Sequence, residues 1–308
     1  MTLQAPFPYF GGKSKIAADI WRRLGNPPNY VEPFLGSAAV LLARPDDHLT
    51  SHPLETVNDK DGFISNFWRA VQHDPEQVAS YADYPINEND LHARHAWLVG
   101  QHDDMTRRLE GDPEWFDAQI AGWWVWGMCL WIGSGFCSGN GPWQVVDRKL
   151  VHLGDNGRGE TEKLQSGIYE WFDLLQARLR HVRVCSGDWS RVMGPSVTEK
   201  HGLTGIVLDP PYDASRQDDL YRVDSQSLYA EVRQWAIEHG TNPLYRIAYC
   251  GYEDGFLWPD GWTELAWKGP AGFDGQRKNG TNENRRRERV WFSPHCLQTV
   301  VQLSFMED

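Results

Sequence analysis

The sequence predicts an α/β protein with a doubly wound, mostly parallel sheet and a mainly helical insertion. Short apolar runs typical of strands alternate with helical segments in both end portions of the chain. Such alternation is typical of parallel strands joined by helices that cover both faces of a sheet. The 308 residues, of which 41% are hydrophobic, suffice for one large domain that carries an insertion.

Seven strands and three helices are predicted outside the insertion. The strands are expected at residues 30–34, 56–58, 182–185, 205–208, 245–249, 263–267 and 289–292. The helices are expected at residues 37–42, 61–72 and 227–239. In the second of these helices, Phe63, Ile64, Phe67 and Val71 recur at helical spacing, which indicates one buried face.

Roughly residues 75–178 interrupt this alternation, so we predict a core of residues 1–74 and 179–308 with an insertion between them. The insertion is polar to about position 114, then rich in tryptophan and finally rich in glycine. Trp123, Trp126 and Leu130 stand at i, i+3 and i+7, which favours a buried helix face over a surface for stacking bases. Trp143 is the better candidate for contacting a nucleic acid.

The composition bears on partners and location. A net charge of −12 gives no overall basic footprint, although basic residues cluster near the C-terminus: Arg277, Lys278, Arg285, Arg286 and Arg287. This cluster fits a grip on phosphates and a solvated loop equally well. No apolar run approaches membrane-spanning length, and the N-terminus lacks the features of a secretory leader. We therefore expect a cytoplasmic protein with no membrane partner.

Cysteine and histidine usage predicts no metal site. The five cysteines lack C-x-x-C spacing, which argues for free thiols and against structural zinc. His92, His95 and His102 are more simply explained as neighbours on a polar helix than as metal ligands.

Four acidic residues stand at the carboxyl ends of predicted strands: Glu32, Asp59, Asp188 and Asp209. Ligands of open α/β sheets bind at this edge. A single acid after a strand is often only a helix cap. Four acids at one rim suit a cofactor that carries hydroxyl and amino groups.

The most informative segment is Asp209-Pro210-Pro211-Tyr212, directly after the strand at 205–208. A carboxylate, two rigid prolines and an aromatic ring suit a site that holds a flat, amine-bearing group, although a strand-ending turn is the alternative. Two glycine-containing segments accompany it. Tyr9-Phe10-Gly11-Gly12-Lys13 joins aromatic rings to a cation, and the turn after Phe34 has Gly36, where backbone could approach a ligand.

In this order, the motifs resemble the D12 class of DNA adenine-N6 methyltransferases, the group that contains the bacterial Dam methylase, with the α order of motifs. The matching segments are Tyr9-x-Gly11-Gly12-Lys13, Val31-Glu32-Pro33-Phe34-x-Gly36, Asn58-Asp59-x-Asp61, Gly187-Asp188, Asp209-Pro210-Pro211-Tyr212 and Glu288-Arg289-Val290-Trp291-Phe292. The resemblance implies a Rossmann-like class I methyltransferase fold. It also implies transfer of a methyl group from S-adenosylmethionine to adenine N6 at specific DNA sites.

The resemblance also assigns roles by position. It implies cofactor binding by Tyr9, Gly11, Gly12, Lys13, Glu32, Pro33, Phe34, Gly36, Asp59, Asp188 and Asp209. The catalytic segment would be Asp209, Pro210, Pro211 and Tyr212. Asp209 and the Pro210 carbonyl would accept hydrogen bonds from the adenine amine, and Tyr212 would stack on a base flipped out of the duplex.

The same resemblance makes the insertion at 75–178 the target-recognition region. It implies a monomer or weak dimer from a prokaryotic or viral source, with a possible companion nuclease in a restriction–modification pair.

Two departures from the family pattern leave alternatives open. Ala38 stands where the family usually has a second glycine, and residues 131–140 lack the usual recognition-segment character. One alternative is a methyltransferase for another amine acceptor, namely RNA, a nucleotide or a protein amide, which the acidic composition motivates. Another is a catalytically silent DNA-binding homologue. No Pro-Cys dipeptide occurs, which disfavours C5-cytosine chemistry.

Overall fold

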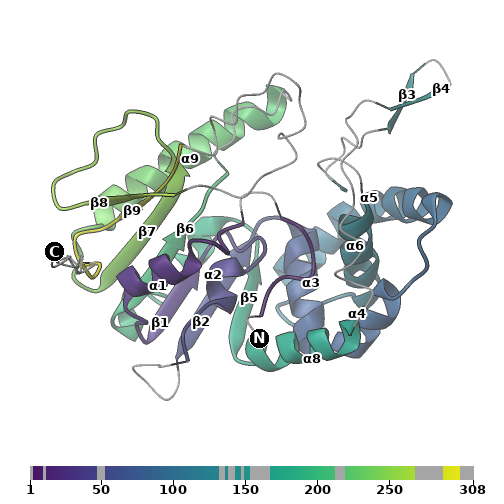
Figure 1. The fold of residues 1–308 in the computed structure, drawn as a ribbon, viewed down its shortest axis with the longest axis horizontal. Helices are drawn as coiled ribbons and strands as arrows, with labels where there is room; N and C mark the ends of the chain where they lie inside the picture. The colour runs from purple at the N-terminus through teal and green to yellow at the C-terminus, as the bar shows by residue number, and fades with distance from the viewer. Residues whose placement is uncertain are drawn as a thin grey trace, which may run out of the picture.

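The computed structural model describes residues 3–9, 12–46, 53–131, 136–137, 143–146, 149–152, 167–211, 219–267 and 287–298, with backbone only at 143–146, 149–152 and 219–226. Figure 1 shows how their helices and strands are arranged. No helix in this part of the chain is long and apolar enough to cross a membrane.

Seven strands of the described chain form one sheet, in the order β5-β2-β1-β6-β7-β9-β8. Their bounds are β1 Asn29–Glu32, β2 Leu54–Asp59, β5 Val182–Ser186, β6 Thr204–Leu208, β7 Tyr245–Tyr252, β8 Thr263–Ala266 and β9 Glu288–Phe292. The pairings from β5 to β7 are parallel, and β9 runs antiparallel to both of its neighbours. All seven predicted strands are therefore present, and the arrangement is that of a class I methyltransferase fold.

The strand order reverses at β1. From β1 the chain passes first to β2 and β5 on one side and later to β6 and β7 on the other. At such a switch point the connections leave in opposite directions, so a crevice opens at the carboxyl ends of the central strands. In this sheet β1 and β6 are the two strands at the switch point.

The helices outside residues 75–178 follow the predicted pattern with shifted ends. They are α1 Ala17–Leu24, α2 Ala39–Leu42, α3 Gly62–His73 and α9 Asp219–His239, together with the 3₁₀ turns η1 Trp189–Val192 and η2 Glu199–His201. Helix α2 begins later than predicted because Ala38 adopts the left-handed conformation, with φ of 54°. Helix α3 begins where predicted, since the Asp61 side chain accepts a hydrogen bond from the Phe63 N–H.

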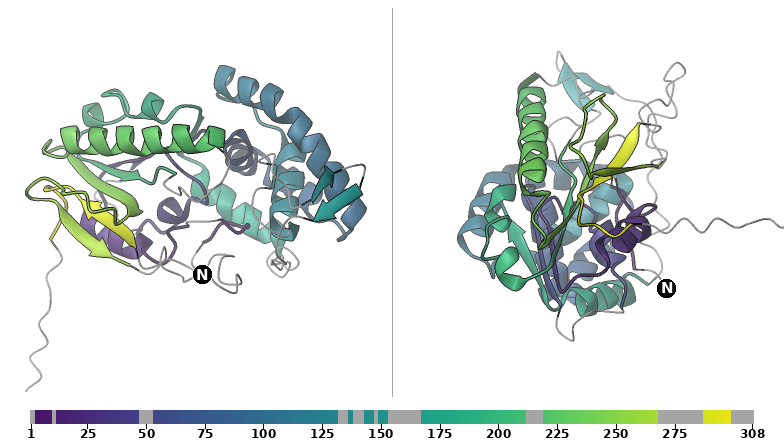
Figure 2. Two further views of the ribbon diagram at one scale, coloured as in Figure 1. Left: turned by 90° about the horizontal axis from the view of Figure 1, so that it is seen from above. Right: turned by 90° about the vertical axis from the view of Figure 1, so that its left-hand side faces the viewer.

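Alternation along the strands separates two apolar faces. Val207 and Ala248 pack on the face that α1, α2 and α3 cover, whereas Ile206, Leu208 and Ile247 pack against η1 and α9. Successive side chains of a strand point to opposite faces, so each central strand is buried on both. Figure 2 shows α1 and α9 on opposite sides of the sheet.

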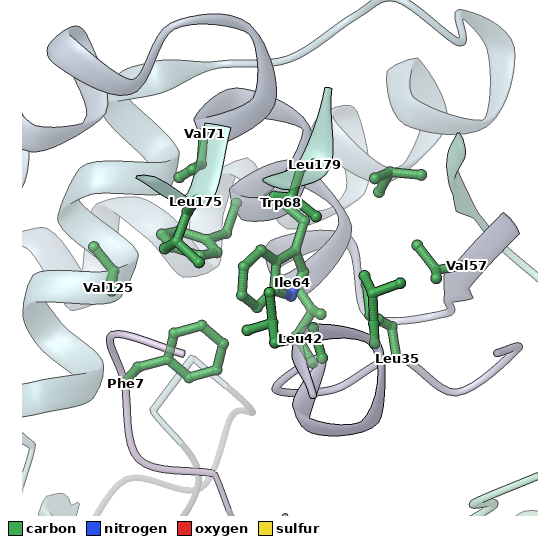
Figure 3. Close-up of a cluster of buried hydrophobic side chains, with 14 of the residues drawn as sticks. Phe7, Leu35, Leu42, Val57, Ile64, Trp68, Val71, Val125, Leu175 and Leu179 are labelled. Atoms are coloured by element: carbon green, nitrogen blue, oxygen red, sulfur yellow. The ribbon is translucent and has the colours of Figure 1, made fainter. Parts of the chain in front are cut away.

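Residues 75–178 contribute mainly helices. The elements are α4 Pro75–Ala82, α5 Glu88–Gly111, α6 Ala118–Leu130, the antiparallel hairpin of β3 Trp143–Val146 and β4 Lys149–His152, and α8 Ile168–Leu179. Helices α4, α6 and α8 pack against α3 in the same hydrophobic core as the sheet face. Figure 3 shows Val125 and Leu175 beside Trp68 and Phe7 in this core.

The tryptophans of α6 serve packing. Trp124 and Trp126 are buried, and the Trp126 indole N–H donates to the Tyr84 carbonyl at 3.0 Å. Trp123 and Leu130 are only half-buried, and Trp123 packs edge-on against Trp97. Of the predicted face of 123, 126 and 130, only Trp126 is fully buried, and the buried side of α6 also includes Trp124, Val125 and Cys129.

Candidate active site

Three of the four predicted acids lie on one face of the sheet at the carboxyl edge. Tyr30, Val57 and Val207 point to the face covered by α1, α2 and α3. Because side chains alternate, the residues two positions later along the chain, Glu32, Asp59 and Asp209, emerge toward the same side. Their charges are mutually close, since both Asp59 and Asp209 contribute to the raised pKa of Glu32.

Asp209 is held by a lysine from the N-terminal segment. Lys13 Nζ lies 2.8 Å from Asp209 Oδ2, and the lysine side chain is almost fully buried. Burial disfavours the ammonium, but the summed effect of the acidic groups around it, with Asp209 the largest, outweighs burial and raises the pKa of Lys13. For Asp209, burial raises the pKa of the carboxyl, and the positive charge of Lys13 opposes that rise.

The second carboxylate oxygen of Asp209 is free to accept. Asp209 Oδ1 is buried and makes no hydrogen bond with any residue that the structure describes. A buried acceptor without a donor costs free energy of about 1–3 kcal/mol. A ligand that brings an N–H to this oxygen would recover that cost.

Glu32 is a buried acid with a local donor. The Tyr30 hydroxyl donates to Glu32 Oε2 at 2.9 Å. Burial dominates nonetheless and raises the pKa of Glu32 to about 8. Glu32 therefore carries a proton at neutral pH until a cationic or hydrogen-bonding ligand favours its charged form.

Asp59 organises the backbone around it. Its Oδ2 accepts the Gly36 N–H at 2.8 Å and its Oδ1 accepts the Asp61 N–H at 2.9 Å. Burial raises the pKa of Asp59 to about 7, and these two backbone donors oppose the rise. Each oxygen keeps a second lone pair for a ligand hydroxyl or amine.

At Gly36 the absence of a side chain lets the N-terminal segment approach the backbone closely. Gly36 has φ of 48°, and a Cβ added there would lie 2.5 Å from Cε1 of Tyr9. The Tyr9 ring thus lies against the Gly36 backbone, while a Cβ at Gly12 would meet the Ser37 hydroxyl at 3.4 Å. Only glycine at position 36 lets the aromatic ring approach the turn so closely.

Asn58 ties three strand ends together. Its side-chain N–H groups donate to the carbonyls of Pro33 at 3.1 Å and Gly187 at 3.0 Å. Gly187 in turn donates its N–H to the Asp59 carbonyl at 3.0 Å. These bonds fix the loops after β1, β2 and β5 relative to one another.

The remaining predicted site residues that the structure describes form no hydrogen bond or ion pair with the carboxylates of Glu32, Asp59 or Asp209. Asp188 is exposed and caps η1 through the Ser190 N–H, so here the ordinary capping role of such an acid is what the structure shows. Phe34 stacks on Trp189 with ring centroids 6.1 Å apart. Pro33 is buried at the end of β1, Pro210 is buried beside Asp209, and Pro211 is exposed.

Several predicted residues fall outside the described residues: Gly11, Tyr212, Arg277, Lys278, Arg285 and Arg286. Trp143 lies in β3, but its side chain is not described. Arg287 is exposed, and its guanidinium donates to the Glu253 carbonyl at 3.1 and 2.7 Å.

Three residues near Lys13 were missed by sequence reasoning. The Trp267 ring centroid lies 5.9 Å from Lys13 Nζ, the charge of Glu288 acts on the lysine, and the Cys250 thiol lies near it. Glu288 and Cys250 are both buried. An acid that opens an apolar β-strand, as Glu288 opens β9, was the available signal for a buried partner.

The arrangement suits a cationic ligand that carries hydroxyl and amino groups. Acidic acceptors, an aromatic ring and an approachable backbone turn meet at the carboxyl edge of the sheet, and S-adenosylmethionine has matching groups. Nothing in the described part of the chain assembles three or more His, Cys, Asp or Glu side chains as metal ligands. The five cysteines are free thiols.

Among comparisons with known proteins, a family model matches part of the chain, whereas no curated protein matches it significantly. The matched family segment begins at Tyr9, contains Lys13, Glu32, Gly36 and Asp59, and ends within α5. Residues 9–98 match the D12 class N6 adenine-specific DNA methyltransferase family, which confirms the resemblance that the motifs indicated.

Proposed function

We propose that this protein transfers the methyl group of S-adenosylmethionine to the N6 amine of adenine in DNA. The observation that carries the proposal is Asp209, at the carboxyl end of β6, with one oxygen held by Lys13 and the other buried without a donor. The family match over residues 9–98 supports the adenine amine as the acceptor.

Asp209 and Pro210 supply the chemistry that the amine requires. The exocyclic amine of adenine is a poor nucleophile because its lone pair is delocalised into the ring. The Asp209 carboxylate and the Pro210 carbonyl accept its two N–H bonds, which favours a more tetrahedral nitrogen. Asp209 then stabilises the positive charge that develops on nitrogen, and the excess amine proton leaves to this carboxylate or to water.

Lys13 keeps the acceptor in its reactive form. Burial alone would favour a protonated Asp209, which would present a donor to the amine. The buried ammonium favours the carboxylate and fixes Oδ2, so that Oδ1 remains directed to the substrate.

The cofactor is proposed to bind to the acids at the strand ends and to the turn at Gly36. When bound, S-adenosylmethionine supplies an electrophilic methyl group on sulfonium. Tyr9, Lys13, Glu32, Asp59 and Asp209 are the residues proposed to hold it, with Gly12, Pro33, Phe34 and Gly36 shaping the walls, and Gly11 and Asp188 completing the set.

Access to the amine requires an extruded base. Inside a duplex the adenine amine is out of reach, and unstacking costs a few kcal/mol. We propose that Tyr212 stacks on the flipped base. Residues 75–178, with the β3–β4 hairpin and Trp143, are proposed to recognise the target, and the basic cluster at 277–287 to contact phosphates. A companion nuclease would make the pair a restriction–modification system.

A direct test is to incubate the protein with unmodified DNA and S-adenosylmethionine, digest the DNA to nucleosides and measure N6-methyldeoxyadenosine by mass. We expect Asp209→Ala to lower the rate by at least about 10²–10³, whereas Asp46→Asn, on the exposed surface, retains it. RNA and protein acceptors offered against DNA identify the substrate class. Wild-type labelling by Asp209→Ala would contradict the mechanism.

A further inference from the structure

A basic cavity lies away from Asp209, at the edge strand β5. It has a volume of about 550 Å³, and its walls come from α3, α5 and the whole length of β5. Volumes of about 300–1,000 Å³ are typical of small-ligand sites. Its lining includes three arginines, Arg69, Arg183 and Arg191, and one acid, Glu110.

The three arginines share the cavity with one acid, Glu110, but form no ion pair with it. None of them has a carboxylate within ion-pair distance in the part of the chain that the structure describes. Arg191 donates to the Ser186 carbonyl. The charge of Asp112 acts on Arg69 without forming an ion pair. In a chain of net charge −12, three arginines that share one cavity form an unusual concentration of positive charge.

Arg69 is buried and keeps part of its guanidinium unused. Its Nε donates to the Val184 carbonyl at 2.9 Å, and its Nη1 donates to the carbonyls of Leu109 at 3.0 Å and Asp112 at 3.1 Å. Its Nη2 makes no hydrogen bond with a described residue. A buried cation whose bonds go only to neutral carbonyls retains its full charge for an anion.

A buried hydroxyl at the same cavity also lacks a partner. Ser186 is 2% exposed, and its Oγ makes no hydrogen bond within the described residues. Gly187 follows with φ of 119°, and a Cβ there would lie 2.5 Å from Arg191 Nη1 and 3.1 Å from Glu110 Oε1. The glycine therefore lets backbone and guanidinium approach each other beside the unpartnered hydroxyl.

We propose that this cavity binds a phosphate group through Arg69, Arg183, Arg191 and the Ser186 hydroxyl. Guanidinium groups match phosphate oxygens in geometry and charge, and a hydroxyl donates to a third oxygen. The phosphate comes either from a DNA backbone or from a free phosphorylated molecule. The site is separate from Asp209 and does not depend on the methyl-transfer proposal.

The experiment measures binding of inorganic phosphate by thermal unfolding and by ³¹P NMR line width, against sodium chloride of equal ionic strength. We expect phosphate to stabilise the wild type, and Arg183→Ala and the Arg183→Ala/Arg191→Ala double variant to bind it at least about tenfold more weakly. Ser186→Ala is expected to weaken binding less. Arg180→Ala, which removes an exposed arginine outside the cavity, is the charge-matched control and is expected to bind as the wild type does.

A second arm identifies the source of the phosphate. If DNA supplies the phosphate, the slope of log affinity for duplex DNA against log salt concentration should become shallower by about 1, the value for one lost phosphate contact. This change is expected in Arg183→Ala and not in Arg180→Ala. If only inorganic phosphate binding is lost, a free phosphorylated molecule is the ligand. Phosphate that stabilises no more than chloride does, or equal weakening by Arg180→Ala, would overturn the proposal.

Discussion

At the scale of single residues, the site is a set of acids that differ in how their charge is supported, with Glu32 buried and Asp59 and Asp209 half-buried. Asp209 has a buried ammonium beside it, Asp59 has two backbone donors, and Glu32 has one phenol. Burial raises the pKa of all three carboxyls. Each partner opposes that rise, but burial remains the larger effect in all three.

Replacing Lys13 should change the pH dependence of methylation. In Lys13→Met the ammonium that opposes protonation of Asp209 is gone, so we expect the acid limb of the rate profile to move to higher pH. At pH 7 we expect a loss of at least about tenfold. Lys13→Arg, which keeps the charge, should restore much of the wild-type profile. A Lys13→Met enzyme that is slower at all pH values with an unmoved limb would reduce Lys13 to a structural contact.

Cofactor binding should release protons. With pKa values of about 8 for Glu32 and about 7 for Asp59, Glu32 is mostly protonated and Asp59 about half protonated at pH 7 in the free protein. A cationic ligand favours the carboxylates, so S-adenosylmethionine should bind more tightly as pH rises from 6 to 8. Calorimetry in two buffers of different ionisation enthalpy counts the protons. An affinity that does not vary with pH would contradict this prediction.

The same raised pKa values act on stability with the opposite sign. The folded protein holds protons on Glu32 and Asp59 that the unfolded chain loses above about pH 4. Their contribution to stability is therefore fully present below that pH and is lost as the pH rises through about 7 and 8.

At the scale of elements, a buried charge network joins β2, the end of α2 and α8. Glu55 on β2 accepts from Arg44 at 3.0 Å and from Arg178 at 2.7 Å, and Arg178 also donates to the Leu41 carbonyl at 2.8 Å. Burial alone would raise the pKa of Glu55, but the two arginines outweigh it and lower it. This network fixes α8 against the strand.

Removing the acid of this network should be costly. Glu55→Gln leaves two arginines without their counter-charge, and we expect a loss of about 3–5 kcal/mol in the free energy of unfolding. Glu231→Gln, on the exposed face of α9, is the control and should change little. Because the pKa of Glu55 is lowered, the difference between wild type and Glu55→Gln should shrink as pH falls through that pKa. Urea denaturation across pH measures both effects.

At the scale of the whole molecule, the sheet and the helices of residues 75–178 share one core. Phe67 of α3 lies against the rings of Phe7 at 5.3 Å, Trp124 at 5.8 Å and Phe172 at 6.0 Å. These side chains come from the N-terminal segment, α3, α6 and α8. The helices therefore continue the core of the sheet.

A shared core predicts one cooperative transition. Trp124→Ala should remove about 3–5 kcal/mol from the free energy of unfolding of the whole protein. Circular dichroism and tryptophan fluorescence should report coincident transitions in both proteins. Two separate transitions, with only the helical signal shifted by Trp124→Ala, would show that residues 75–178 unfold on their own.

Local sequence patterns were enough to predict most of the fold and many of the residues of the candidate site. Apolar strand runs located all seven strands, and the side chain that follows each run put Glu32, Asp59 and Asp209 at one rim. Ends of elements were less well predicted. Strand β1 stops at Glu32 because Pro33 has no N–H for the ladder, and α2 starts only at Ala39 because Ala38 is left-handed. Both deviations come from backbone conformation that apolar patterns do not encode.

The amino-acid sequence alone determined the α/β class, the order of the strands along the chain and the acids at their ends. Each of these depends on neighbours within a few residues. Only the tertiary structure brought Lys13 to Asp209, Tyr9 to Gly36, and three arginines to one cavity beside β5. Such contacts join distant segments, so they are decided by how whole elements pack.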